Sequence, residues 1–219
     1  ELTGLKLEAE MRAMVDRGVI KGMSNGKVMP KADVRRSDFA AFAARLLALP
    51  PADPTFQDVN QSMAVGKEIG AIERAGYMTG DNKGHFRPND VMTREEMAVT
   101  LQRIAKDLQL KPTDNRKMTV RDASRFSLKE GVESAQYVAA LGVMNGLSMN
   151  TNRTVMTFEP KAPSKRDQVA AVLYRLSHLM DGKEIERPTE PNKPAPLPDL
   201  PKPPKPPPPS VVKPSFSRD

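Results

Sequence analysis

Hydrophobic residues recur at helical spacing in three stretches of the chain, each directly ahead of a glycine-rich turn. Spacings of three or four residues predict an amphipathic helix in each stretch. Each helix leads into the same pattern: a glycine, two apolar residues, any residue and a second glycine. The first glycine stands where a left-handed residue typically ends a helix. The apolar positions are Leu7, Met11 and Met14, then Val65, Ile69 and Ile72, then Ala135, Val138 and Leu141, ahead of Gly18, Gly76 and Gly142.

A second helical stripe follows each turn, after a proline and a short polar block. The prolines are Pro30, Pro88 and Pro160. Each copy is therefore predicted to be a helix, a loop and a second helix. Because one such unit is too small to bury its apolar face alone, the copies are expected to pack on one another. The second stripes are Phe39, Phe42 and Leu46, then Met97, Leu101 and Ile104, then Val169, Leu173 and Leu176.

The predicted fold class is all-α, with three tandem helix-loop-helix repeats followed by an extended Pro-rich tail. The repeats are placed at residues 1–53, 54–111 and 112–182, and the third carries an inserted loop at 147–157. Thirteen of the 21 prolines fall between Pro188 and Pro214. Residues 183–219 are therefore expected to be disordered or polyproline II, forming a semi-rigid spacer. A spacer suggests a passenger domain beyond Asp219.

Composition narrows the possible chemistry. The chain has no cysteine, no tryptophan and two histidines, so disulfides and thiolate metal sites are excluded, and a histidine-based metal or catalytic site is not expected. No cofactor, metal or enzyme activity is predicted, and no apolar stretch approaches the length of a membrane span. The net charge of +7 permits an anionic partner, but acidic residues are interleaved throughout, so we expect no nucleic-acid partner. The first residue is Glu1, which suggests a processed or cut chain.

The polar block that opens each second helix contains the candidate binding residues. Thr93 and Glu96 form a capping-box pattern, in which each side chain accepts a backbone N–H of the other. Asp38 and Gln168 take the place of Glu96 in the other copies, where no threonine precedes them. Each block also places an arginine at the helix start, where the helix dipole favours anions instead. These arginines, Arg36, Arg94 and Arg166, therefore indicate a negative partner, with a purely structural capping block as the alternative.

Taken together, these motifs resemble the S-layer homology family. Its pattern is an F-x-D-V entry, an apolar helix ending in G-[IV]-[IV]-x-G, a glycine turn, F-x-P and a T-R-A-E box. The resemblance covers about residues 5–181 and is fullest in the second copy. That copy carries Phe56-Gln57-Asp58-Val59, Gly76 to Gly80, Gly84, Phe86-Arg87-Pro88 and Thr93-Arg94-Glu95-Glu96.

What the resemblance implies is a pseudo-threefold helical bundle that anchors a secreted protein non-covalently to the bacterial cell wall. The usual ligand of the family is an anionic secondary cell-wall polysaccharide with pyruvate ketals, or in some relatives modified peptidoglycan. The expected location is the cell wall or S-layer. A self-assembly module whose repeats contact protein subunits is the alternative.

Groove residues follow from the same resemblance. Arg94, Arg36 and Arg166, in that order, are expected to bind a carboxylate through paired charge-assisted hydrogen bonds. Backbone N–H groups at Gly22, Gly80 and Gly146 would add donors. Tyr77 is a candidate for stacking on a sugar, with ordinary core packing as the alternative.

Overall fold

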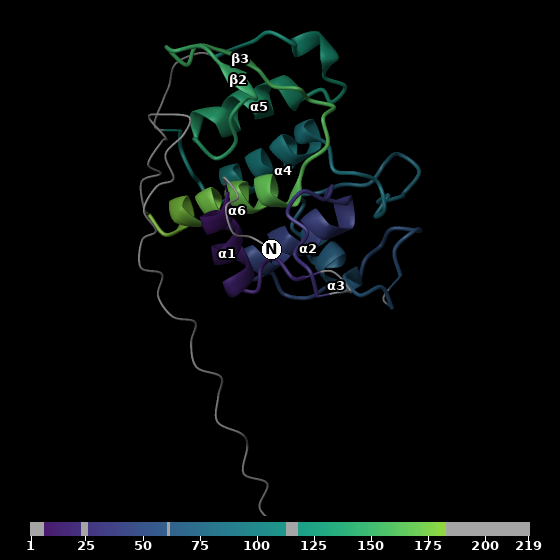
Figure 1. Cartoon of the computed structure of the whole chain (residues 1–219). Coiled ribbons are helices and arrows are strands. Elements are labelled where there is room, and N and C mark those ends of the chain that lie inside the picture. Colours follow the sequence, from purple (N-terminus) through teal and green to yellow (C-terminus); the bar gives the residue numbers. More distant parts are fainter. Residues whose placement is uncertain (1–6, 23–25, 61, 113–117, 183–219) are drawn as a thin grey trace, which may run out of the picture.

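The computed structural model describes residues 7–22, 26–60, 62–112 and 118–182, and within them the chain is mostly helical. Six α-helices follow one another as three pairs (Figure 1). The predicted Pro-rich spacer at 183–219 lies outside the described residues. The first pair is α1 (Glu8–Asp16) and α2 (Arg36–Leu46), the second α3 (Gly66–Arg74) and α4 (Arg94–Asp107), and the third α5 (Gly131–Ala140) and α6 (Arg166–Met180).

The first helix of each pair ends at the predicted glycine. Gly76 has φ +74°, its N–H donates to Glu73 O at 2.8 Å, and the N–H of Tyr77 donates to Ile72 O at 3.1 Å. This is the hydrogen-bond pattern of a Schellman motif, which satisfies carbonyls left open at a helix end. Gly18 and Gly142 repeat it with φ +70° and +77°, so the predicted left-handed caps are confirmed.

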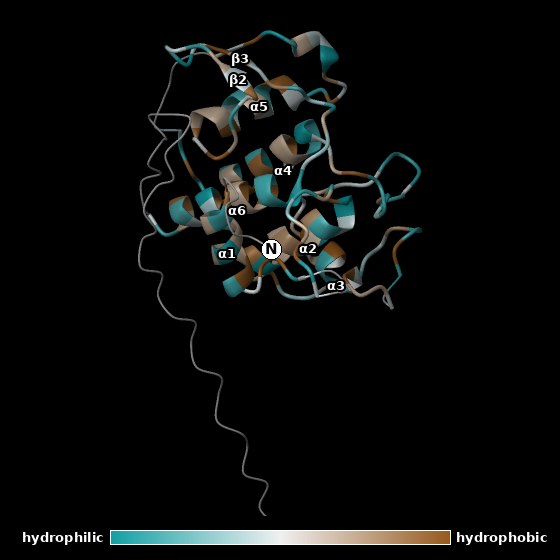
Figure 2. Ribbon diagram, in the orientation of Figure 1, coloured by the Kyte–Doolittle hydropathy of each residue, from teal (hydrophilic) through white to brown (hydrophobic). Residues whose placement is uncertain are grey.

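The predicted hydrophobic stripes meet in a single core. Most of their members are fully buried, among them Met11, Ile69 and Val138 from the first helices and Phe39 and Leu173 from the second. Figure 2 shows brown hydrophobic segments alternating with teal polar segments along the helices, as expected for amphipathic helices. One shared core is what units too small to fold alone require.

The helices pack between pairs in a closed order. The second helix of one pair packs against the first helix of the next, as α2 does with α3 and α4 with α5, and α6 returns to α1. Three backbone hydrogen bonds close a ring at the segments before the second helices. Val34 N donates to Ser164 O at 2.8 Å, Ser164 N to Met92 O at 3.0 Å, and Met92 N to Val34 O at 2.8 Å. Each helix pair is thus joined to both others.

A small sheet interrupts the helical pattern in the third pair. β1 (Thr119–Val120) runs parallel to β3 (Val155–Thr157), and β2 (Ser148–Met149) runs antiparallel to it, so β3 is central. A short 3₁₀ helix, Ala123–Arg125, follows β1. Residues 147–157, expected to be a plain loop, therefore contain two strands. Helical periodicity could not reveal them, because strands of two or three residues leave almost no alternation to detect.

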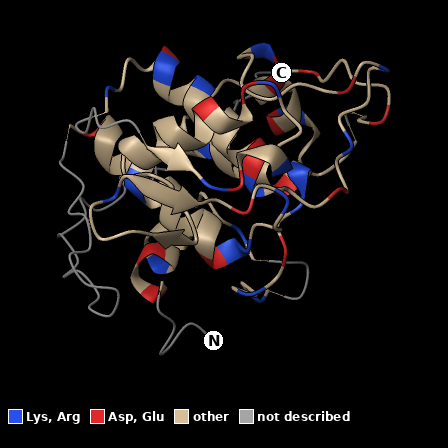
Figure 3. Cartoon of the chain, turned by 90° about the horizontal axis from the view of Figure 1, so that it is seen from above, with Lys and Arg blue, Asp and Glu red and all other residues tan. Residues whose placement is uncertain are grey.

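Charged residues of both signs lie side by side over the surface (Figure 3). This agrees with the interleaving of acids and bases along the sequence. Among the described residues, no helix has both the length and the apolar character needed to cross a membrane.

Candidate functional site

The polar blocks lie at the N-termini of the second helices, as their sequence predicts. At α4, Glu96 accepts the backbone N–H of Thr93 at 3.0 Å, and Thr93 Oγ1 accepts the N–H of Glu96 at 3.4 Å. Asp38 and Gln168 accept the equivalent backbone N–H at 3.4 and 3.3 Å. Their partner side chains, Arg35 and Lys165, have no acceptor atom to return the bond. A reciprocal capping box therefore forms only at α4 among these three helix starts.

Arg94 leaves the helix start and reaches the loop of the third pair. Its Nε donates to Phe158 O at 2.8 Å, its Nη2 donates to Asn145 O at 2.8 Å, and its guanidinium lies 4.7 Å from the Phe158 ring centre. Burial lowers the pKa of Arg94 to about 10, although Asp122 and Glu159 act in the opposite direction. The guanidinium remains charged at neutral pH, and in the described part of the chain its Nη1 has no hydrogen-bond partner.

Arg36 makes the same contacts one pair earlier. Its Nε donates to Phe86 O at 2.9 Å and its Nη2 to Thr79 O at 3.1 Å, both in the loop of the second pair. It differs from Arg94 in having a carboxylate partner, because its Nη1 lies 2.7 Å from Glu96 Oε1. Burial lowers the pKa of Arg36, and Glu96 opposes that shift.

Arg166 closes the cycle on the first pair. Its Nε donates to Val28 O and its Nη2 to Lys21 O, both at 2.7 Å, and burial lowers its pKa. All three arginines are nearly inaccessible, with 5%, 5% and 2% of the surface of Arg36, Arg94 and Arg166 exposed. The structure therefore brings the three predicted arginines into equivalent places, where each joins its own helix pair to the next.

Two aspartates support the loops that Arg36 and Arg94 hold: Asp58 of the F-x-D-V segment and Asp122, whose segment Val120-Arg121-Asp122-Ala123 stands at the corresponding place ahead of α5. Asp58 accepts the N–H groups of Phe86 and Arg87 at 2.7 and 2.8 Å, and Asp122 does the same for Phe158 and Glu159. Arg87 and Glu159 have φ +59° and +58° ahead of a proline, a conformation that ordinary side chains adopt at a cost. The carboxylates fix this turn. The sequence analysis included Asp58 only as part of the F-x-D-V motif.

The second glycines of the turns are explained by close packing. A Cβ at Gly80 would lie 2.6 Å from the Phe56 ring and 2.7 Å from His85 O. At Gly146 it would lie 2.7 Å from Thr157 O, and at Gly22 3.0 Å from Gly26 O.

Tyr77, the candidate for sugar stacking, is 7% exposed, and its hydroxyl donates to Asp107 at 2.6 Å. Burial, followed by the bond to Asp107, raises the pKa of Tyr77 to about 12.

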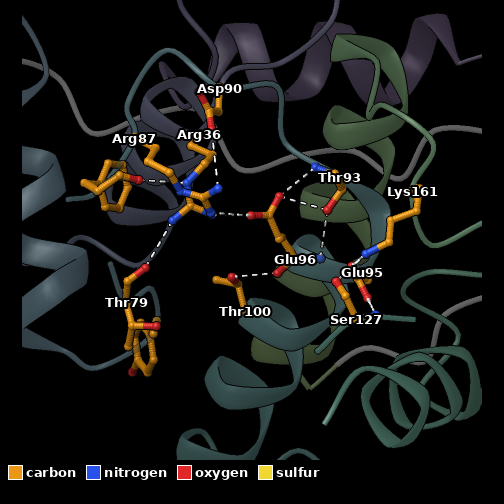
Figure 4. A network of polar contacts seen from close by, with 12 residues as sticks. Arg36, Thr79, Arg87, Asp90, Thr93, Glu95, Glu96, Thr100, Ser127 and Lys161 are labelled. Atoms are coloured by element: carbon orange, nitrogen blue, oxygen red, sulfur yellow. Dashed lines mark hydrogen bonds and ion pairs between the residues drawn. The ribbon is translucent and has the colours of Figure 1, made fainter. Parts of the chain in front are cut away.

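A cleft of about 400 Å³ opens where the second and third pairs meet, beside the start of α4 (Figure 4). Thr93 and Glu96 line it, whereas the three arginines, the three second glycines and Tyr77 do not. The other lining residues are Arg87, Asp90, Val91, Glu95, Ser127, Leu128 and Lys161.

Glu95 organises one wall of this cleft. Lys161 Nζ pairs with its carboxylate, Ser127 Oγ donates to Oε1 at 2.7 Å, and the N–H groups of Ser127 and Leu128 donate to Oε2 at 3.0 and 3.4 Å. Burial raises the pKa of Glu95, but these hydrogen bonds outweigh it and leave the pKa below its ordinary value. The carboxylate is thus held ionised and only 3% of its side chain is exposed.

Glu96 organises the opposite wall. Beyond its cap of Thr93, it lies 2.7 Å from Arg36 Nη1 and 3.3 Å from Arg87 Nη2 (Figure 4). Arg87 also lies 3.4 Å from Asp90. The side chains of Arg87 and Lys161 remain 45% and 44% exposed, compared with 17% for Glu96. Arg87 and Lys161 are therefore more exposed than Glu96 and Glu95, whereas Asp90, the other partner of Arg87, is 54% exposed.

Arg87 and Lys161 were not among the predicted site residues. Each lies next to the proline of its turn, in Phe86-Arg87-Pro88 and Pro160-Lys161, so the sequence did offer a signal in their position. In the part of the chain that the structure describes, no three histidine, aspartate or glutamate side chains gather as metal ligands would. The site offers two exposed cations, exposed apolar side chains at Val91 and Leu128, and backbone-anchored carboxylates.

Comparison with known proteins finds similarity to bacterial enzymes and to S-layer proteins, all much longer than this chain. An amylopullulanase of Thermoanaerobacterium thermosulfurigenes is 29% identical over 170 residues, and exoglucanase XynX of Acetivibrio thermocellus is 28% identical over 168 residues. Each alignment covers 76% of this chain but only 9% and 15% of the relative. S-layer protein EA1 of Bacillus anthracis is 32% identical over 97 residues, which are 43% of this chain and 11% of EA1. The chain therefore spans a small part of the length of these relatives.

A family comparison assigns two segments. Residues 7–40 match the S-layer homology domain, and so do residues 55–98. The first match includes α1 and the start of α2, and the second includes α3 and the start of α4 with its capping box. The third predicted repeat remains a prediction. The first and second helix pairs of this chain thus each contain a segment that matches the S-layer homology domain, and S-layer proteins are among its relatives.

Proposed function

We propose that this chain is a non-catalytic anchor that attaches a secreted protein to the bacterial cell wall. The observation that carries the proposal is the distribution of its relatives. An amylopullulanase, an exoglucanase and S-layer proteins, which differ in name, are similar to all or part of this region, and the matched part is a small fraction of each. A segment common to proteins with different names fits a task that all need, such as attachment at the cell surface. The activities that the enzymes' names state would then reside in the parts of those relatives outside the aligned region.

The proposed arrangement is a pseudo-threefold bundle of three S-layer homology repeats. Support comes from the cyclic packing of the helices, the ring of backbone bonds at Val34, Met92 and Ser164, and the equivalent arginine contacts. Passenger domains beyond a spacer at 183–219 belong to the same proposal, since the relatives are much longer than this chain.

For the ligand we propose an acidic wall glycan, such as a pyruvylated secondary polysaccharide, bound between helix pairs. The cleft of about 400 Å³ beside α4 supports this choice, because its most accessible charges after Asp90 are Arg87 and Lys161. Val91 and Leu128 supply apolar surface for the CH faces of a sugar ring. Arg94 and Arg36 would act beside the cleft by shaping its walls, and Arg94 Nη1 is an available donor.

The proposal is tested by sedimenting the protein with purified bacterial walls before and after their polysaccharide is stripped. Binding should disappear with the polysaccharide, and equal binding to both preparations would refute glycan recognition. Monomeric protein at high concentration with retained wall binding would argue against self-assembly as the main role.

The cleft is tested by the double variant Arg87→Gln, Lys161→Gln, which should lower wall affinity at least tenfold, because one charge-assisted hydrogen bond contributes about 1.5–3 kcal/mol and about 1.4 kcal/mol is a factor of ten. A matched control is Arg12→Gln, Lys67→Gln. It also removes two exposed cations from ion pairs, with Glu8 and Asp53, away from the cleft. Equal losses in both variants would indicate a non-specific charge effect. If removing Lys161 destabilises the fold by leaving Glu95 without its cation, the single variant Arg87→Gln is measured instead and should also lower wall affinity.

A further inference from the structure

The small sheet of the third pair turns a polar face outward. Its register aligns Val120 with Met156 and Met156 with Met149, and these residues form the inward row. Val120 and Met156 are 7% and 1% exposed. Because side chains alternate across a strand, Thr157 and its partner Ser148 belong to the opposite face.

Arg121 completes the outward row. It directly follows β1, its N–H donates to Met156 O at 2.9 Å, and it lies beside Thr157 in a hollow of about 170 Å³. Neighbouring strands are about 4.8 Å apart, so the side chains of Arg121, Thr157 and Ser148 leave the backbone at nearly regular intervals across the sheet. Within the described residues, the side chains of Arg121, Ser148 and Thr157 make no hydrogen bond or ion pair. The lining residues are Arg121, Ser148, Met149, Asn150, Val155, Met156 and Thr157.

The segments that form this face carry charge of one sign, and Glu159, two residues beyond Thr157, is paired with Arg125 at 2.6 Å. Residues 118–121 and 147–157 contain two arginines, Arg121 and Arg153, and no aspartate or glutamate. Asp122 follows immediately, but it is 9% exposed and both of its oxygens accept backbone N–H groups. In the cleft beside α4, by contrast, each cation is paired with a carboxylate. An accessible guanidinium without a carboxylate partner is available for an anion from outside the protein.

We propose that the outward face of the β1-β3-β2 sheet is a second binding site, and that it takes a carboxylate-bearing sugar of a glycan chain. Arg121 would pair with the carboxylate through two parallel hydrogen bonds, and Ser148 and Thr157 would exchange hydrogen bonds with ring hydroxyls. Val155, two residues from Thr157 on β3, adds a small apolar surface to the same hollow. The inference rests on the proposed function, since the same wall polymer would contact both the cleft and the sheet.

The composition of the face selects this ligand class. A nucleic acid presents a phosphate at every nucleotide and is held by several cations, whereas this row supplies one guanidinium. A protein partner is usually anchored by large apolar or aromatic side chains at the centre of the contact, and the outward row has none. One cation at the β1 edge, followed by the hydroxyls of Thr157 and Ser148, matches a sugar that carries one carboxylate.

The site is tested by titrating the full chain with oligogalacturonate as the probe and following backbone NMR shifts. Wild type should show shifts at Arg121, Ser148 and Thr157, and Arg121→Gln should weaken binding about three- to tenfold, as expected for one partly exposed charge-assisted contact. Thr157→Val, which keeps the strand shape, should weaken it less. The matched control is Arg74→Gln on α3, an exposed arginine without a hydrogen-bond partner in the described residues, and it should leave binding unchanged.

Each outcome is decisive. Equal affinity in Arg121→Gln and Arg74→Gln, or shifts confined to the α4 cleft, would overturn the sheet site while leaving wall anchoring intact. Binding of poly(glycerol phosphate) that exceeds oligogalacturonate binding and is lost in Arg121→Gln would overturn the carboxylate assignment. Binding of neutral dextran at the same face would overturn the role of charge. Wall sedimentation of the same proteins distinguishes failure of the sheet site from failure of the proposed function. If wild type does not bind walls but still binds oligogalacturonate at Arg121, the proposed function is refuted and the sheet site is not.

Discussion

Replacing Arg94 by alanine should destabilise the fold strongly, because this side chain joins the second helix pair to the third. Its two hydrogen bonds to Phe158 O and Asn145 O are both 2.8 Å long, and the residue is 5% exposed. A hydrogen bond from a charged donor contributes about 1.5–3 kcal/mol, and its loss here leaves two carbonyls without their donors. We expect Arg94→Ala to lower the free energy of unfolding by about 3–5 kcal/mol, a large share of the 5–15 kcal/mol typical of a domain.

The measurement is equilibrium urea unfolding followed by far-ultraviolet circular dichroism, with the slope against urea used to check that both states remain comparable. Arg94→Lys should recover roughly half of the loss, because an ammonium can reach one carbonyl but does not reproduce the planar fork. The control is Arg12→Ala, which breaks an exposed i, i+4 pair with Glu8 and should change stability by about 0.5 kcal/mol or less. If Arg94→Ala lost no more than that control, the junction contacts would not stabilise the fold as we argue.

Three further predictions concern the glycine turns, the cleft wall and the ring centre. Gly76→Asn should lower the melting temperature only slightly, because Gly76 has φ +74° with open space around a Cβ and asparagine tolerates this conformation. Gly80→Asn should lower it several-fold more, because the new Cβ would lie 2.6 Å from the Phe56 ring. Similar melting temperatures for the two variants would contradict this. Glu95→Gln should lower stability by about 1–3 kcal/mol at neutral pH and flatten its acid dependence. The pKa of Glu95 is lower in the folded state, so its contribution to stability is fully present above about pH 4.5 and is lost as the pH falls through the folded pKa. Unfolding midpoints measured across this pH range should show the loss in wild type. The same acid dependence in Glu95→Gln would count against this role. Ser164→Ala should keep or raise the unfolding midpoint, because the fully buried Ser164 hydroxyl has no partner among the described residues, and a loss above about 1 kcal/mol would reveal a missing one.

Local patterns in the sequence predicted the helix pairs because each depends on neighbouring residues. The first glycine of each turn specifies its own left-handed backbone conformation, and an apolar stripe such as Met97, Leu101 and Ile104 specifies its own burial, wherever the helix packs. The capping pattern at Thr93 and Glu96 is equally local. These features are therefore where sequence reasoning and structure agree most closely.

The partners of the arginines could not be predicted in the same way. The dipole at a helix start indicated that Arg94 needs a negative partner, and the structure supplies carbonyl oxygens of Phe158 and Asn145 from the next pair. Every residue carries a carbonyl, so composition does not distinguish those that will accept a bond. The cleft residues Arg87 and Lys161 were not predicted as site residues for a related reason. They come from turns far apart in the chain that only the packed fold brings together.

The arginine junctions also determine where a ligand site can exist. The cleft takes one wall from Glu96 of the second pair and the other from Ser127 and Lys161 of the third, while Arg94 fixes the loop that ends at Phe158 just before Pro160 and Lys161. The β-sheet face belongs to that same loop, because β2 and β3 lie between Asn145 and Phe158, the two residues whose carbonyls Arg94 holds. One buried guanidinium therefore positions both proposed glycan contacts without touching either ligand, which makes Arg94 a structural requirement for binding even if its own donors never meet the glycan.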